Sequence, residues 1–216
     1  MGDRILILGA SGLVGRHALR LALDHPAIEQ VIAPTRTALA PHGKLSNPQA
    51  HALGTLVSDV PAVDAVICAL GTTIAKAGSQ DAFREIDHAL PLAFAKAAHR
   101  LGAKAFALVS AVGASSSSRF FYVRTKGEVE RDVQKVGFSS LTILRPSLID
   151  GDRGEFRGGE SAALRLCKLF EPLLPRGWRV NPASVIAAAA VEAVMSRKEG
   201  TRFIYSREMT EERPGQ

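Results

Sequence analysis

A strand, a glycine-rich turn and a helix follow one another at the start of the chain, and this order restricts what it can fold into. The apolar run 5–8 leads into Gly9-Ala-Ser-Gly12-Leu-Val-Gly15, and residues 16–23 have the composition of a helix. The first glycine permits a tight turn, the second lets backbone approach a pyrophosphate, and the third lets helix pack closely on strand. The helix N-terminus then faces the phosphates. The segment predicts a dinucleotide site; the alternative is a tight turn without a ligand.

The rest of the chain alternates between strand-like and helix-like segments. Short apolar runs typical of doubly buried strands occur at 4–8, 30–34, 49–53, 64–69, 105–109, 141–145 and 202–205. This alternation predicts an α/β fold, a doubly wound parallel sheet of about seven strands with helices on both faces. We expect a single domain over 1–216, with residues 146–180 as a substrate-side insertion.

Two prolines mark expected helix boundaries. One apolar stripe at helical spacing comprises Phe83, Ile86, Leu90, Phe94 and Ala97. Pro91 interrupts this stripe, which predicts a kink or two consecutive helices with Pro91 in the first turn of the second. Further on, Asn181 followed by Pro182 predicts a cap and a first-turn proline for a helix that ends at about Arg197.

Composition narrows the function classes. The net charge of +6 comes from scattered Lys and Arg residues, which suits a phosphorylated cofactor and argues against a nucleic-acid partner. No apolar run reaches the roughly 18 residues of a membrane span, and the histidines lack metal-ligand spacing. Cys68 and Cys167 lie in apolar contexts and are expected to be buried free thiols of a reducing compartment. Since a strand is expected from residue 4, there is no room for a signal peptide, and we expect a cytoplasmic protein.

The second expected strand bears on the choice of cofactor. In a site for NAD, an Asp or Glu about 20 residues after the glycine turn binds the ribose hydroxyls. Here Arg36 lies at that distance, and a guanidinium there can pair with a 2′-phosphate. This favours NADP(H); the alternative is a solvated loop arginine. Asp59, at the end of the third strand-like segment, is a candidate for the adenine edge, or else a helix or turn cap.

A Tyr-x-x-x-Lys pattern supplies candidate chemistry. On a helix, Tyr122 and Lys126 share a face that continues through Val129, Val133 and Val136, so this face is expected to point inward. A lysine on an inward face needs a polar partner, such as a bound ribose and a tyrosine oxygen. The alternative is a lysine that snorkels to solvent.

Carbonyl reduction needs a hydride on carbon and a proton on oxygen, and a free tyrosine has a pKa of about 10. A nearby ammonium favours the phenolate, so Lys126 would assist Tyr122 as the acid/base. Ser110, at the end of the fifth expected strand, lies where ligands bind in open α/β sheets. It is the candidate to hold the substrate oxygen; the alternative is a strand-end turn serine.

The glycine spacing, Ser110 and the Tyr-x-x-x-Lys pair are similar to those of the short-chain dehydrogenase/reductase superfamily. Segments 68–78, 121–130 and 144–148 resemble an atypical branch of it, with Tat-interacting-protein-like proteins and small NAD(P)H-binding, epimerase-like proteins. The resemblance implies a seven-stranded Rossmann fold and NADP(H), with Pro146 near the nicotinamide. The cofactor-binding residues expected in all are Gly9, Ser11, Gly12, Leu13, Val14, Gly15, Arg36, Asp59, Leu70, Gly71, Thr72, Lys126 and Pro146.

Two function classes follow. The first is an NADP(H)-dependent oxidoreductase that acts on a small carbonyl or alcohol through Ser110, Tyr122 and Lys126. The second is a non-catalytic NADP(H)-binding sensor or scaffold with a protein partner; a homo-oligomer fits either class. A sugar-nucleotide epimerase is disfavoured because residues 146–216 are few for a second nucleotide site. Three charged residues after the sixth expected strand either face the substrate or lie in a solvated loop: Arg153, Glu155 and Arg157.

Overall fold

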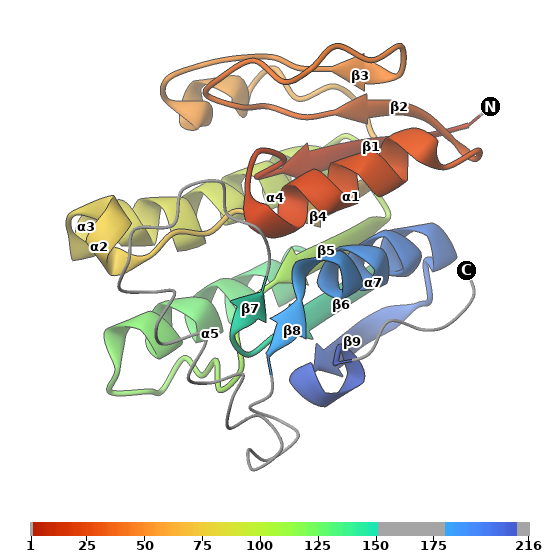
Figure 1. Ribbon diagram of the computed structural model, residues 1–216. Helices are drawn as coiled ribbons and strands as arrows, with labels where there is room; N and C mark the ends of the chain where they lie inside the picture. Colours follow the sequence, from red (N-terminus) through yellow and green to blue (C-terminus); the bar gives the residue numbers. More distant parts are fainter. Residues whose placement is uncertain (1, 151–179, 211–216) are drawn as a thin grey trace.

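The computed structural model describes residues 2–150 and 180–210, and its main element is a parallel sheet of seven strands (Figure 1). The strand order is β3-β2-β1-β4-β5-β6-β9, and every pairing is parallel. The strands are β1 (Asp3–Leu8), β2 (Ile28–Ile32), β3 (Leu45–Ser46), β4 (Ala65–Cys68), β5 (Ala105–Val109), β6 (Ser140–Arg145) and β9 (Gly200–Tyr205). A separate pair joins β7 (Ile149–Asp150) to β8 (Asn181–Pro182). The predicted doubly wound α/β fold is confirmed.

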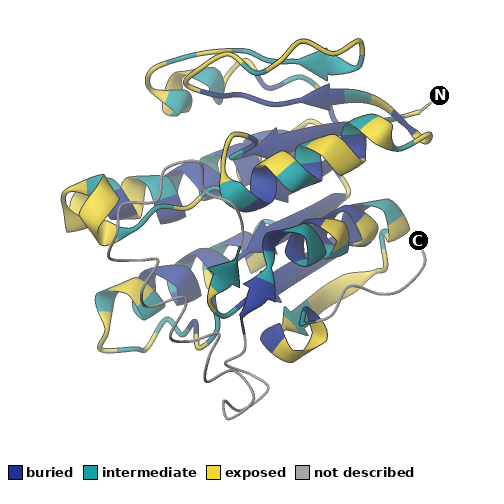
Figure 2. Ribbon diagram, in the orientation of Figure 1, coloured by how far each residue is buried: buried dark blue, intermediate teal, exposed yellow. Residues whose placement is uncertain are grey.

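Helices cover both faces of the sheet. Helices α1 (Leu13–Asp24) and α7 (Ala183–Ser196) lie on one face, and α4 (Leu90–Arg100) and α5 (Phe121–Gln134) lie on the other (Figure 1). In β1, Ile5 and Ile7 pack toward the first pair of helices and Leu6 and Leu8 toward the second, because side chains alternate along a strand. The central strands β1, β4, β5 and β6 are therefore buried on both faces, whereas β9 at the edge is mostly exposed (Figure 2).

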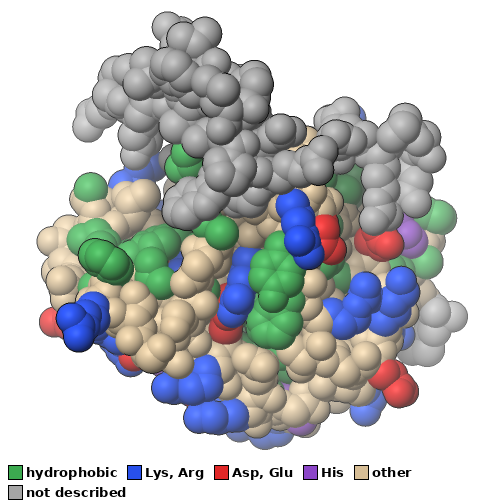
Figure 3. All heavy atoms as spheres, turned by 90° about the horizontal axis from the view of Figure 1, so that it is seen from below, with side chains coloured by type: hydrophobic (Ala, Val, Ile, Leu, Met, Phe, Trp, Pro, Cys, Tyr) green, Lys and Arg blue, Asp and Glu red, His purple; other side chains and the backbone are tan. Residues whose placement is uncertain are grey.

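Short helical segments complete the connections. They are η1 (Leu53–Leu56), α2 (Ile74–Ala77), α3 (Gln80–Arg84), η2 (Glu85–Ala89) and η5 (Ser206–Glu208). No helix within the described residues is long and apolar enough to span a bilayer. On the face seen in Figure 3, Lys and Arg side chains are spread among hydrophobic, acidic and uncharged ones and do not merge into one stripe.

The prediction of a strand at 49–53 is wrong. The third strand in sequence is β3, and residues 53–56 form the turn η1. Backbone N–H groups of β2 and of the residues that directly follow it instead donate to the carbonyls of Lys44, Ser46 and Pro48. An edge strand has a partner on one side only and tolerates polar residues, so apolar content at 49–53 was a poor guide. The other six strand predictions match strands of the sheet, with shifts of up to two residues at their ends.

The interruption predicted at Pro91 is confirmed. Helix α3 passes into η2, a π-helical turn, and α4 begins at Leu90, so Pro91 lies in the first turn of α4. Pro91 has no N–H to donate to the carbonyl of Asp87 four residues earlier, and a regular α-helix is therefore interrupted at this point.

The cap predicted at Asn181 is wrong. The residue that precedes α7 is Pro182, and the helix has no side-chain cap. The Asn181 side chain is fully buried and accepts the Ser147 N–H at 2.8 Å. It donates to the carbonyls of Ser206 (2.9 Å) and Met209 (3.0 Å). A buried amide satisfies more of its hydrogen-bonding groups in this way than it would at a helix end.

Candidate active site

The glycine turn lies where the chain changes direction in the sheet. From β1 the chain runs outward to β2 and β3, then crosses back to β4 on the other side of β1. Ligands of open α/β sheets bind at such a point, outside the carboxyl ends of the strands. Gly9, with φ of 82°, follows β1, and a Cβ there would lie 2.6 Å from the carbonyl oxygen of Ala69. The structure thus brings the glycine turn beside Ala69 and Leu70 after β4.

The start of α1 fits a pyrophosphate. Gly12 is the cap residue; no side chain caps the helix and its first turn has no acidic residue. The first helical bond runs from the Arg16 N–H to the Gly12 carbonyl at 3.0 Å, so the N–H groups of residues 13–15 precede the intrahelical ladder. A Cβ at Gly15 would lie 1.9 Å from the Gly9 carbonyl oxygen, so only glycine lets helix and turn meet this closely. Such a helix end attracts anions.

A cavity of about 590 Å³ extends from this turn along α1. Its polar lining combines Ser11, Arg16, Arg20 and Asp24 with residues 37–42 after β2. Arg36 is exposed and lies one residue before this loop, outside the lining. Asp59 is exposed and follows η1 instead of a strand, and it accepts a hydrogen bond from the Ser58 hydroxyl at 3.2 Å. The prediction of a strand end at Asp59 is therefore wrong.

Tyr122 and Lys126 lie on α5, and the inward face predicted for Lys126 is confirmed. The Lys126 side chain is 7% exposed and its Nζ lies 2.7 Å from Oδ1 of Asp87. Burial alone would lower the pKa of Lys126, but the charges of Asp87 and Tyr122 outweigh it, and the pKa is raised. The ammonium is therefore the stable form, and the snorkelling alternative is wrong. Tyr122 is 38% exposed, with its ring 5.6 Å from that of Phe83.

Ser110 follows β5 as predicted, but its hydroxyl has an unforeseen partner. It is buried and donates to Glu130 at 2.5 Å. Glu130 is also buried and accepts two hydrogen bonds from the Arg145 guanidinium, from Nε at 3.0 Å and from a terminal nitrogen at 2.5 Å. A hydroxyl has one hydrogen and two lone pairs. With that hydrogen given to Glu130, Ser110 can accept a further bond.

Sequence reasoning missed Asp87 and Glu130, although a signal for each was present. Asp87 is four residues after Phe83, in the apolar stripe that packs on the sheet. Glu130 is four residues after Lys126 on the inward face of α5. An acid in a buried stripe needs a partner, as a buried lysine does.

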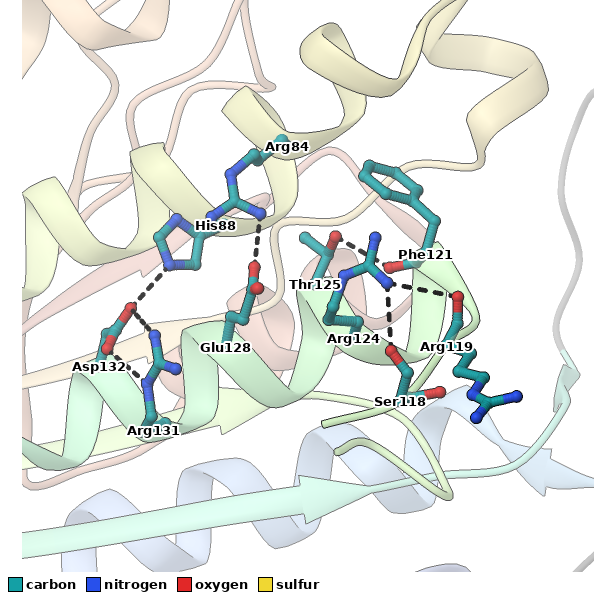
Figure 4. A network of polar contacts seen from close by, with 10 residues as sticks. All are labelled: Arg84, His88, Ser118, Arg119, Phe121, Arg124, Thr125, Glu128, Arg131 and Asp132. Atoms are coloured by element: carbon teal, nitrogen blue, oxygen red, sulfur yellow. Dashed lines mark hydrogen bonds and ion pairs between the residues drawn. The ribbon is translucent and has the colours of Figure 1, made fainter. Parts of the chain in front are cut away.

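Ion pairs fix α5 against the preceding helices (Figure 4). Arg84 of α3 pairs with Glu128, and His88 of η2 lies 3.0 Å from Asp132. Asp132 also accepts two hydrogen bonds from Arg131, which are the main reason that the pKa of Asp132 is lowered. The helix that carries Tyr122 and Lys126 therefore has fixed neighbours.

The loop before α5 is held on the same helix. A Cβ at Gly127 would lie 2.1 Å from the backbone carbon of Ser115, so loop and helix backbones are in direct contact. The Arg124 guanidinium donates to the carbonyls of Ser118 (3.1 Å) and Arg119 (3.3 Å) (Figure 4).

Other predicted residues lie at the carboxyl ends of neighbouring strands. Pro146 is buried after β6, and its carbonyl accepts the Val112 N–H at 2.7 Å. Cys68 at the end of β4 is a buried free thiol, as predicted, and burial raises its pKa to about 12. Cys167 and the candidates Arg153, Glu155 and Arg157 lie outside the described residues. Within residues 2–150 and 180–210, no cluster of three His, Cys, Asp or Glu side chains is placed to hold a metal ion.

Comparison with known proteins identifies relatives over most of the chain. Residues 5–148 match the model of the NAD dependent epimerase/dehydratase family. The chain is 38% identical over 212 residues to "Protein fmp52, mitochondrial" of Aspergillus clavatus, covering 91% of this chain and 88% of that protein. It is 40% identical over 167 residues to the Candida albicans protein FMP52, covering 73% and 72%.

Solved structures share the fold at low sequence identity. The Bordetella bronchiseptica enzyme WbmH in complex with NAD+ has a TM-score of 0.71 at 17% identity, over 95% of this chain and 76% of that one. A short chain dehydrogenase family protein from Francisella tularensis has a TM-score of 0.71 at 15% identity, over 96% and 99%.

These relatives correct one prediction and establish the family. The Aspergillus and Candida proteins are named as mitochondrial, which contradicts the predicted cytoplasmic location. Free thiols and the lack of a membrane-length apolar run do not distinguish one reducing compartment from another. They were therefore insufficient grounds for predicting a cytoplasmic location. The glycine turn at the switch point and the match over most of the sheet agree: the chain belongs to the NAD dependent epimerase/dehydratase family.

Proposed function

We propose that the protein is an NADP(H)-dependent oxidoreductase of the short-chain dehydrogenase type, which reduces a small carbonyl or oxidises a small alcohol. The observation that carries this proposal is the buried Lys126 ammonium on the helix of Tyr122, beside the loop that follows β4. A buried charge is costly, and a site for a cofactor ribose and a reactive tyrosine gives it a use.

Each residue has a distinct role in the proposal. The nicotinamide cofactor supplies or accepts the hydride. Residues 9–15 hold the pyrophosphate, while Leu70, Gly71, Thr72 and Pro146 line the site. Tyr122 donates the proton to the substrate oxygen in reduction and takes it back in oxidation, and the Lys126 ammonium stabilises the phenolate. Ser110 holds the substrate oxygen, and its hydroxyl hydrogen must turn from Glu130 to that oxygen to do so.

A tyrosine replacement tests the chemistry. Tyr122→Phe should reduce kcat by about 10²–10⁴-fold with little change in NADPH affinity, since general acid–base catalysis contributes that much. The measurement is NADPH oxidation with a panel of small carbonyl compounds. Tyr205→Phe is the matched control, because the chain has two tyrosines and Tyr205 lies on the edge strand β9. Unchanged turnover in Tyr122→Phe would refute the mechanism.

The preference for NADP(H) over NAD(H) rests on charge near the end of β2. The cavity along α1 is lined by Arg16 and Arg20, and Arg36 lies next to its loop. Asp24 also lines the cavity, 4.0 Å from Arg20, and the sequence has no Asp or Glu between residues 30 and 58. Asp59 is proposed at the adenine edge.

Calorimetry with the two cofactors tests this preference. The unmodified protein should bind NADPH more tightly than NADH, and Arg36→Asp should abolish or reverse the difference, since a carboxylate repels a 2′-phosphate. Arg202→Asp is the control: Arg202 is exposed on β9, at the far edge of the sheet from β2. Equal affinity of the unmodified protein for both cofactors would contradict the 2′-phosphate argument.

The second candidate is a non-catalytic NADP(H)-binding sensor that regulates a protein partner. The observation that favours it is the bond from Ser110 to Glu130, because a hydroxyl without a free hydrogen does not polarise a carbonyl. Under this function, a partner would bind only with NADPH present and no compound of the panel would be turned over.

A further inference from the structure

We infer that Asp87 is a positioning residue for Lys126, whose carboxylate fixes the ammonium beside the loop after β4 and in reach of Tyr122. The inference rests on the proposed function, in which Lys126 acts on the cofactor and on the tyrosine. It adds a residue from a different helix to the Tyr-x-x-x-Lys pair.

The helix geometry brings Asp87 to this place. Asp87 lies in the π-helical turn η2, directly before the α4 turn that contains Pro91. It is 1% exposed, between the buried side chains of Phe83 and Leu90. Single π turns within α-helices are frequent at functional sites. Here the turn presents a carboxylate to α5 from within an otherwise apolar helix face.

The two carboxylate oxygens have different partners. Oδ1 lies 2.7 Å from Lys126 Nζ, and Oδ2 accepts the backbone N–H of Thr72 at 2.9 Å. A Cβ at Gly71 would lie 3.5 Å from Oδ1 and 3.7 Å from Nζ, so the ion pair adjoins this exposed glycine. Asp87 therefore links the lysine to the loop expected to line the cofactor.

The charge of Asp87 also matters. The titratable groups that face Lys126 are Asp87 from η2, Tyr122 from its own helix and Cys68 from β4. Burial favours the neutral amine, and Asp87 is the main group that opposes this. An ammonium has three donors, so beside its ion pair with Asp87 it keeps donors for a ribose hydroxyl and the phenolic oxygen.

The test is the pH dependence of NADPH affinity in Asp87→Asn. The amide oxygen can still accept the Thr72 N–H, but the charge is lost, so burial should remove the Lys126 proton at lower pH. NADPH affinity of the variant should fall by about tenfold more than that of the unmodified protein between about pH 7 and 9. The measurement is the fluorescence of bound NADPH, and the matched control is Asp81→Asn, an exposed acid on α3.

Lys126→Met separates this inference from the proposed function. It should weaken NADPH binding at every pH, and adding Asp87→Asn should cause no further pH dependence. If Lys126→Met binds NADPH normally, the proposed role of Lys126 fails. If it weakens binding while Asp87→Asn retains the pH profile of the unmodified protein, the positioning role of Asp87 is wrong.

A stability measurement covers the case in which Asp87→Asn is too unstable for the binding assay. The double variant removes both buried charges, and removal of one partner of a buried pair costs more than removal of both. Its Tm should exceed the value expected if the two single effects added. If the double variant loses as much stability as the two single variants together, measured as melting temperatures or as refolding yields, the inference is overturned.

Discussion

Replacing Gly15 with alanine is expected to abolish NADPH binding and to lower the free energy of unfolding by about 3 kcal/mol, at the upper end for overpacking. The new Cβ would lie 1.9 Å from the Gly9 carbonyl oxygen, 2.6 Å from its carbon and 3.0 Å from Cα of Ala10. All three are backbone atoms, so no side-chain rotation relieves the clash. The turn must move away from the helix, and the N–H groups that we propose to bind the pyrophosphate move with it.

Calorimetry with NADPH and chemical denaturation measure the two effects. Gly43→Ala is the control, because a Cβ at Gly43 meets no atom within 4 Å. We expect this variant to bind and unfold like the unmodified protein. Normal NADPH affinity in Gly15→Ala would show that the glycine turn does not form the cofactor site.

Replacing Gly127 with alanine is expected to have the second large effect, a loss of stability. Alanine favours a helix interior over glycine by about 1 kcal/mol, so the helix alone would gain stability. The tertiary structure reverses this sign, since the Cβ would lie 2.1 Å from the carbon of Ser115 and 2.2 Å from the nitrogen of Ser116. Overpacking of this kind costs about 1–3 kcal/mol, and α5 must shift with Tyr122 and Lys126 on it.

The Tm and the NADPH affinity should both be lower in Gly127→Ala than in the unmodified protein. Gly54→Ala is the control, because its nearest contact is a flexible leucine side chain at 3.5 Å. If Gly127→Ala is more stable than the unmodified protein, the loop at 115–118 yields to the helix and does not fix its position.

Most of the sheet could be predicted because its signals are local. A strand buried on both faces needs a continuous apolar run, and β1, β4 and β5 each have one, while in β6 the run is interrupted only by Thr142. The glycine turn is equally local as a signal, since the strand, the glycines and the helix that identify it follow one another within residues 3–24. The edge strand β3 was missed because a strand paired on one side carries a weak apolar pattern.

The sequence by itself determined the strand–turn–helix start and the helix face shared by Tyr122 and Lys126, because both depend on spacings of a few residues. Only the tertiary structure decided which groups these side chains meet. Asp87 lies 39 residues before Lys126, and Glu130 lies 20 residues after Ser110. Such pairs form across different elements, and their energies come from burial, which no local pattern contains. The fold thus placed one acid beside the lysine and another beside the serine.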